Sequence, residues 1–112
     1  MKRIDAILRP HRLEDVVTRL RLVGVTGMTV AEVHGMSPST QLEGVFHGQR
    51  YRFPSAPRYH LMVVVADDAA ATVVRAIAQA ARTEEPGDGI ISIGDVIDAV
   101  RIRTGESGDA AL

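Results

Sequence analysis

The chain lacks cysteine, long apolar runs and a strong charge of either sign. Without cysteine it can form neither disulfides nor thiolate metal sites, which suits a reducing compartment, so we expect a cytoplasmic protein. No uncharged run approaches the ~18 residues that suggest a membrane span, and the apolar part of MKRIDAILRP is too short and too charged for a signal peptide. A net charge of −1 supplies no general attraction for nucleic acid. We expect no membrane insertion and no nucleic-acid partner.

Aromatic side chains are also scarce. They make up 4% of the chain and tryptophan is absent, whereas hydrophobic residues make up 46%, so a core must be built from Val, Ile, Leu and Ala. A chain of 112 residues has room for one shared core but not for two independent ones. We therefore expect a single domain over residues 1–112.

The first third of the chain predicts a strand, a helix and a second strand. Residues 2–9 alternate apolar and more polar side chains until Pro10 ends the pattern. Residues 13–23 repeat apolar side chains at helical spacing, and Gly24 supplies a stop signal. Residues 28–35, MTVAEVHG, return to strand composition.

A second unit of the same kind follows further along the chain. Residues 59–66 are rich in β-formers, Asp67 and Asp68 are candidate helix N-caps, and residues 73–81 carry a second helical stripe before the short strand run 90–93. Two such units side by side predict an α+β, ferredoxin-like fold: a double βαβ with a four-stranded antiparallel sheet and both helices on one face.

The other face of that sheet has no helices to cover it. The run 61–65 is apolar on both faces, so the open side needs a cover. Self-association through the sheet is the economical solution.

Residues 36–57, MSPSTQLEGVFHGQRYRFPSAP, separate the two units and show no sustained periodicity. A segment of this length inside a compact domain is usually functional or disordered. We interpret it as a contact loop for a partner, and the alternative is a tolerated surface insertion.

Two short motifs carry residues that suit phosphate. In EEPGDGIISI, Gly87 and Gly89 can direct their N–H groups toward an anion, although Asp-Gly is also an ordinary turn signal. In RIRTG, a β-like run would place the guanidinium groups of Arg101 and Arg103 on one face, where they suit phosphate or simply face solvent. Both motifs gain weight if they meet in space.

Catalytic and metal signatures are weaker. No Ser-His-acid or HExxH pattern occurs, and the histidines lack metal-ligand spacing: His11, His34, His47 and His60. A small enzyme or a metal-binding trimer on the same fold remains the alternative class.

Four segments together resemble the PII signalling proteins: MKRIDAILRPHRLEDV, GVTGMTVAEVHG, EEPGDGIISI and VRIRTGESGDAAL. The resemblance covers the whole chain except its central loop. It implies a non-enzymatic ferredoxin-like homotrimer with three clefts between subunits for an adenine nucleotide, ATP, ADP or AMP. It also implies a T-loop, at about residues 36–57, that touches a target protein. The targets that such a loop could reach include membrane proteins.

The resemblance also assigns site residues. In PII proteins the stretches matching 82–90 and 101–105 hold the phosphates, which here means Gly87, Asp88, Gly89, Arg101 and Arg103. The residues matching Thr29 and Val64 meet the adenine, with Ile7 beside it, and Ser37 belongs to the same nucleotide site.

The chain departs from the PII pattern at several of these positions. Ser39 replaces a glutamine that helps to hold magnesium and 2-oxoglutarate, and Pro38 replaces the preceding arginine, so we expect neither ligand to bind in the usual way. Ile90 replaces a lysine, which should weaken ATP binding relative to ADP or AMP, whereas the basic residue of the pattern at position 58 is kept as Arg58. Tyr51 matches a tyrosine that some relatives uridylylate, but in different surroundings.

Such losses resemble those of PII-like proteins outside nitrogen control, including carboxysome-associated ones that respond to bicarbonate together with ADP or AMP. We therefore expect a sensor that favours ADP or AMP and serves inorganic-carbon metabolism. The alternative is an ordinary nitrogen-regulatory PII protein that senses ATP and 2-oxoglutarate.

Overall fold

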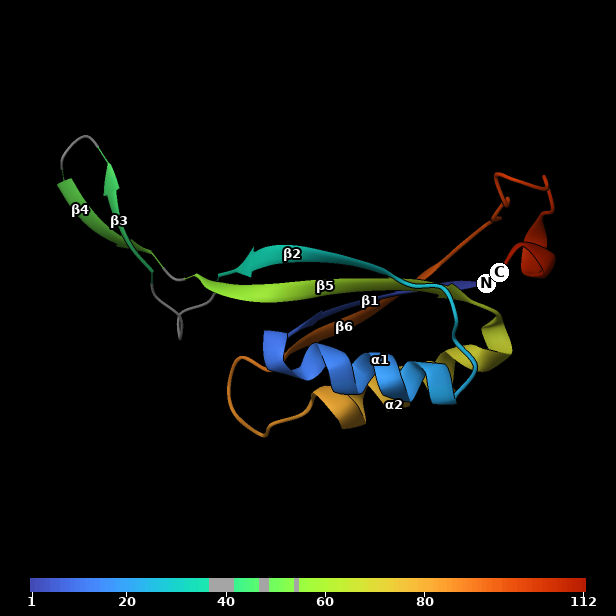
Figure 1. Cartoon of the computed structure of the whole chain (residues 1–112), viewed down its shortest axis with the longest axis horizontal. Coiled ribbons are helices and arrows are strands. Elements are labelled where there is room, and N and C mark those ends of the chain that lie inside the picture. Colours follow the sequence, from blue (N-terminus) through green and yellow to red (C-terminus); the bar gives the residue numbers. More distant parts are fainter. Residues whose placement is uncertain (37–41, 47–48, 54) are drawn as a thin grey trace.

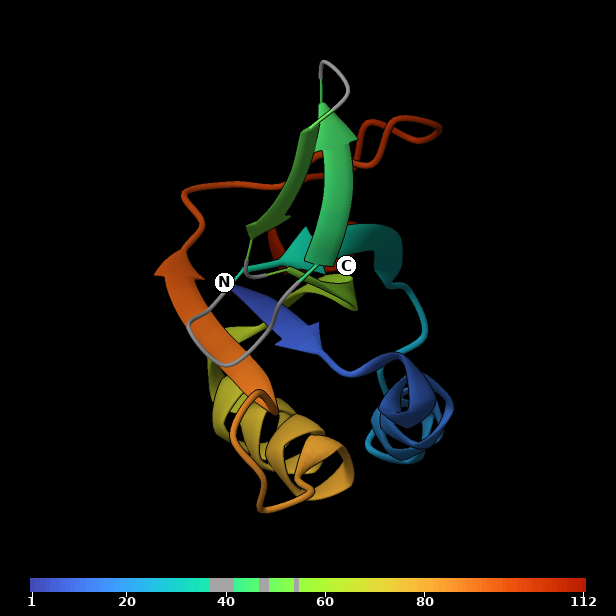
Figure 2. The ribbon, with the colours of Figure 1, turned by 90° about the vertical axis from the view of Figure 1, so that its left-hand side faces the viewer.

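The computed structural model of the protein describes residues 1–36, 42–46, 49–53 and 55–112. A four-stranded sheet carries two helices on one face (Figure 1), and Figure 2 shows both helices on the same side of it. The elements of this layer pair are β1 (Lys2–Leu8), α1 (Leu13–Leu22), β2 (Thr29–Gly35), β5 (Ala56–Val65), α2 (Ala70–Ala81) and β6 (Gly89–Asp95).

The strand order is β2-β5-β1-β6, and every neighbouring pair is antiparallel. The first unit, β1-α1-β2, and the second unit, β5-α2-β6, therefore interleave in one sheet, with β1 between β5 and β6. This order is the ferredoxin-like double βαβ, and it confirms the fold class predicted from the two strand-helix-strand patterns.

The core lies between the sheet and the helices and is aliphatic, as the composition requires. Alternation along β1 sends Ile4, Ala6 and Leu8 into it, and Leu20 of α1 and Leu61 of β5 meet them with no exposed area. Full burial of one such leucine or isoleucine stabilises the fold by about 1.5–3 kcal/mol. These contacts fix the helices against the sheet and so position the loops at its two ends.

The start of α2 differs from the prediction. Asp67 and Asp68 do not cap the helix, because a 3₁₀ turn, Asp67–Ala69, precedes it and Ala69 is the N-cap residue, without a side-chain cap bond. Instead, the carboxylate of Asp67 lies 2.8 Å from the amino group of Met1. An ion pair with the chain terminus is a long-range contact that local spacing does not reveal.

The central interval contains structure that periodicity did not predict. β3 (Leu42–Phe46) and β4 (Gln49–Phe53) form an antiparallel hairpin that extends beyond the ends of β2 and β5 in Figure 1. Tyr51 lies in β4, opposite Gly44. The expectations for Ser37, Pro38 and Ser39 fall outside the described residues.

The sheet face opposite the helices carries a mixed surface. Ile7, Met62 and Val64 are half-buried on it, while Ile97 and Ile102 of the C-terminal segment are fully exposed. Exposed apolar groups of this size suggest a protein interface. Among the described residues, no helix is both long and apolar enough to cross a membrane.

Candidate functional site

The loop between α2 and β6 is organised by the side chain of Asp88. Its carboxylate accepts hydrogen bonds from the Thr83 hydroxyl, from the Thr83 N–H at 2.8 Å, from the Glu84 N–H at 3.0 Å and from Nε of Arg9 at 3.2 Å. These bonds, above all those from Thr83, hold the pKa of Asp88 well below its usual range. Asp88 therefore shapes the loop from within, and its carboxylate is already occupied by donors of the protein.

Two guanidinium groups converge on Gly87 in this loop. Arg9 donates from Nη2 to the Pro86 carbonyl at 2.7 Å, and Arg58 donates from Nη2 to the Gly87 carbonyl at 3.1 Å. A Cβ at Gly87 would lie 3.1 Å from Arg9 Nη2 and 3.2 Å from Arg58 Nη2, and its φ is +98°. Paired planar guanidinium groups suit a phosphate or carboxylate.

Gly89 is required by close backbone contact. Its φ is +112°, and a Cβ there would lie 1.7 Å from the carbonyl oxygen of Ile7 on β1. The approach brings Ile7 against the loop. Ile7, Asp88, Gly89 and Ile90 line one side of a cavity of about 380 Å³, whose other side is formed by apolar residues of α2: Ile77, Ala78 and Ala81. The structure thus places together four of the expected site residues: Ile7, Gly87, Asp88 and Gly89.

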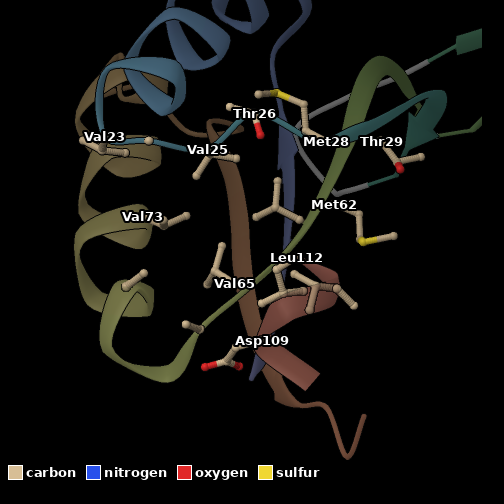
Figure 3. Close-up of a pocket in the computed structure, with 17 residues that line it drawn as sticks. Val23, Val25, Thr26, Met28, Thr29, Met62, Val65, Val73, Asp109 and Leu112 are labelled. Carbon is tan, nitrogen blue, oxygen red and sulfur yellow. The ribbon is translucent and has the colours of Figure 1, made fainter. Parts of the chain in front are cut away.

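Thr29 and Val64 lie in a different cavity, of about 580 Å³ (Figure 3). Residues 23–29 and 62–66 form two of its walls, and Asp109 and Leu112 of the C-terminal segment form a third. The polar side chains of the lining are those of Thr26, Thr29 and Asp109, and its other side chains are apolar. Such a lining suits a flat, weakly polar ring.

Arg101 and Arg103 are not in a strand, so the prediction that both face the same way along a β-run is wrong. Gly105, with φ +73°, closes a turn: its N–H donates to the Arg101 carbonyl at 2.8 Å, and the Arg101 N–H donates to the Glu106 carbonyl at 2.8 Å. Nη2 of Arg101 also donates to the Leu112 carbonyl at 3.2 Å, which ties it to the wall of the larger cavity. Arg103 is exposed.

The glycine loop and the arginine turn do not meet within one chain. They lie at opposite ends of β6, which runs its seven residues between them (Figure 1). Each chain therefore carries two separated half-sites. We name the group of Ile7, Arg9, Arg58 and residues 82–90 the loop half-site, and the group of Thr29, Val64 and residues 101–112 the cavity half-site.

Arg9 was not among the predicted ligand residues, and Arg58 was noted only as a basic residue of the PII pattern that this chain keeps. Arg9 follows β1 directly, and the alternation of residues 2–9 in the sequence assigns it to the same face as Ile7, a signal that could have marked it. Arg58 lies on β5, 29 residues before Gly87, and only the fold brings the two together.

The described histidines do not gather into a metal site. No group of three His, Cys, Asp or Glu residues that could hold a metal occurs in the described part of the chain. His60 instead lies 2.7 Å from the Asp5 carboxylate on the open sheet face, and Nδ1 of His34 lies 3.4 Å from the buried Ser55 hydroxyl. Hydrogen bonds to Asp5, from Arg3 first and also from His60, lower its pKa.

Comparison with known proteins decides the family. A family model described as nitrogen regulatory protein P-II matches residues 1–106. The chain belongs to the PII family. Members of this family are regulatory proteins that form homotrimers and contact target proteins.

Individual relatives agree with that assignment. The chain is 43% identical to nitrogen regulatory protein P-II of Klebsiella oxytoca and to P-II 1 of Escherichia coli K12, over all 112 residues of each. It is 43% identical to P-II 2 of Methanothermobacter thermautotrophicus, covering 97% of that protein. The crystal structure of Arabidopsis thaliana PII bound to citrate superimposes with a TM-score of 0.82 at 32% identity, covering 99% of this chain and 91% of the other.

These relatives favour the nitrogen-regulatory alternative over the inorganic-carbon interpretation. The three curated relatives named above are nitrogen regulatory proteins, and their names give no support to a bicarbonate or carboxysome role.

Proposed function

We propose that this PII protein is a non-enzymatic nitrogen regulator that binds an adenine nucleotide between neighbouring subunits of a homotrimer. The nucleotide sets the conformation of the loop at about residues 36–57, and that loop contacts a target protein. The observation that carries the proposal is the separation of two complementary half-sites at opposite ends of β6.

The half-sites complement each other in chemistry. The loop half-site places the guanidinium groups of Arg9 and Arg58 beside a glycine turn, an arrangement that suits phosphates. The cavity half-site has a largely apolar wall, which suits an adenine ring. A head-to-tail interface in a closed ring brings one kind of half-site on each subunit against the other kind on the next. In such a ring, Arg101 and Arg103 of one subunit can reach the phosphates held by the loop of its neighbour.

The exposed apolar residues support assembly. Ile7, Met62 and Val64 on the open sheet face and Ile97 and Ile102 near the C-terminus would all gain from a protein cover. A homotrimer supplies that cover, as the sheet pattern already suggested.

Ile90 bears on which nucleotide the site prefers. It is 67% exposed and follows Gly89 directly, at the position where the PII pattern has a lysine. In the proposed site, an isoleucine there withholds the cation that would hold an outer phosphate. We propose that ADP or AMP binds at least as tightly as ATP. Magnesium has no assigned ligand in this proposal.

The second ligand distinguishes nitrogen control from inorganic-carbon control. The relatives support the nitrogen function, whereas the bicarbonate interpretation rests on the sequence departures at Pro38, Ser39 and Ile90. Binding of two ligands to one site is reciprocal, so the effector can be identified from its effect on the nucleotide. If 2-oxoglutarate tightens ADP or ATP, nitrogen control is supported, and if only bicarbonate does so, the inorganic-carbon alternative replaces it.

Signalling through the loop requires that its two states differ in nucleotide affinity, because a ligand shifts an equilibrium only by its differential affinity for the states. Arg58 and Gly35 connect the nucleotide loop to the base of the central segment: a Cβ at Gly35 would lie 3.2 Å from Arg58 Cγ.

Modification of Tyr51, which matches a uridylylated position, stays a prediction.

The shared site can be tested with complementary variants. Arg103→Ala should weaken ADP binding by about tenfold or more, because a charged phosphate contact is lost, while light scattering still shows a trimer. Arg21→Ala, an exposed arginine on α1, is the matched control and should bind normally.

Mixed trimers of Arg103→Ala and Asp88→Asn chains then decide whether the site is shared. An Arg103→Ala chain keeps the wild-type loop, and an Asp88→Asn chain keeps the wild-type Arg103. An interface that joins these two wild-type parts is an intact site, and an equal mixture contains it in roughly one interface in four. Tight ADP binding should therefore reappear on mixing. If no tight sites reappear, the two half-sites do not bind the same nucleotide and the proposal is wrong.

A further inference from the structure

The loop half-site carries two carboxylates, Glu84 and Glu85, that neither the fold nor the phosphate-binding scheme explains. Among the described residues, Glu84 is the only non-glycine with a left-handed backbone, at φ +69°. That conformation is costly for a residue with a Cβ, and it persists only where neighbouring bonds enforce it. Here the Asp88 carboxylate enforces it by accepting the Glu84 N–H at 3.0 Å.

The same bonds fix where the two side chains leave the loop. Glu84 extends toward Arg82, with 3.3 Å between Oε1 and Nη2, and both side chains are mostly exposed. The Glu85 N–H donates to the Thr83 hydroxyl at 3.3 Å, so this residue also belongs to the folded part of the loop. The two glutamates therefore precede Gly87 by three and two residues and belong to the same folded loop.

These carboxylates cancel the positive charge of the half-site. The cations of the loop and its contacts are Arg9, Arg58 and Arg82, and the anions are Glu84, Glu85 and Asp88, so the formal charges sum to zero. The loop half-site by itself therefore supplies no net attraction that grows with the length of the phosphate chain. In the proposed ring, the cations that add to it are Arg101 and Arg103 of the neighbouring subunit. In the proposed site, each added phosphate would bring more negative charge toward the loop that carries Glu84 and Glu85.

We propose that Glu84 and Glu85 are specificity-determining residues that favour a nucleotide with a short phosphate chain by repelling the outer phosphates of a longer one. This inference rests on the proposed function, in which the loop faces the phosphates of an adenine nucleotide. It differs from the effect of Ile90, which only withholds a favourable cation, because the glutamates add an unfavourable anion.

The test is calorimetric titration of the full-length protein with AMP, ADP and ATP, at matched low ionic strength and with a chelator to keep magnesium off ATP. The variants are Glu84→Gln, Glu85→Gln and the double variant, and Glu14→Gln on α1 is a control for loss of one exposed carboxylate far along the chain. For a carboxylate about 8 Å from an outer phosphate in water, each removed charge should increase the affinity for ATP relative to AMP by about threefold. The double variant should increase this ratio by roughly tenfold.

Glu84→Gly separates charge from backbone strain. It removes both, whereas Glu84→Gln removes only the charge. If charge sets the preference, the two variants shift the ATP-to-AMP affinity ratio equally. A shift in Glu84→Gly that is absent from Glu84→Gln would overturn the electrostatic explanation.

The outcomes distinguish this inference from the function on which it rests. If the parent and all variants bind no adenine nucleotide, the proposed function fails and the inference fails with it. If the parent binds nucleotide but the double variant keeps the parent's ATP-to-AMP ratio, only the inference fails. A change of equal size for all three nucleotides would mark a structural role and would also overturn it.

Discussion

Replacing Gly89 with alanine should destabilise the protein and disable the nucleotide loop together. The new Cβ would lie 1.7 Å from the Ile7 carbonyl oxygen, so the start of β6 must move by more than about 1 Å. That shift breaks the first pairing of β6 with β1, Gly89 with Leu8, at about 1 kcal/mol per hydrogen bond. The left-handed backbone adds roughly 1–2 kcal/mol. We expect a total loss of about 3 kcal/mol in the free energy of unfolding.

Urea unfolding at one fixed protein concentration measures this loss, since assembly makes the apparent stability depend on concentration. Gly94→Ala in the same strand is the matched control, because no atom lies within 4 Å of a Cβ there. It should be neutral or stabilising by about 0.4–1 kcal/mol. Equal midpoints for the two variants, with ADP binding intact in both, would refute the argument from close backbone contact.

Two further predictions concern carboxylates. Asp5 has a pKa below its unfolded value because Arg3 donates to it, so its carboxylate stabilises the fold above about pH 4 and that contribution disappears as pH falls through the folded-state pKa. Asp5→Asn should cost about 1 kcal/mol at pH 7. The urea midpoints of the two proteins should converge as pH falls below about 4 and through the folded-state pKa of Asp5, and a constant gap would contradict this. Asp88→Asn should speed amide hydrogen exchange at Thr83 and Glu84 and weaken ADP binding, whereas unchanged exchange would show that the loop is held by other bonds.

The layered fold was predictable because its periodicities are local. Alternation along residues 2–9 and helical spacing along residues 13–23 and 73–81 each reflect one buried face, and the structure buries those faces. The hairpin of β3 and β4 was not predicted, because its strands show no sustained apolar alternation in the sequence.

The candidate site was less predictable because its contacts join distant segments. Arg9 and Arg58 reach the loop across 77 and 29 residues, and no local spacing encodes that meeting. The strand prediction for Arg101 and Arg103 was wrong because two arginines separated by one isoleucine are compatible with a strand or with a turn. The left-handed backbone of Gly105 and its hydrogen bond to the Arg101 carbonyl form the turn. That the two half-sites lie apart could be learned only from the three-dimensional arrangement.

The most direct test of the account is the stoichiometry and affinity of adenine nucleotide binding to the purified, assembled protein. Calorimetry should show ADP binding at about micromolar Kd, a binding free energy near −8 kcal/mol, with one site per chain of a trimer. The Arg103→Ala variant should bind ADP more weakly but still form a trimer. Absence of binding by ADP, AMP and ATP alike, or tight binding to a monomer, would contradict the claim that neighbouring subunits share a nucleotide site.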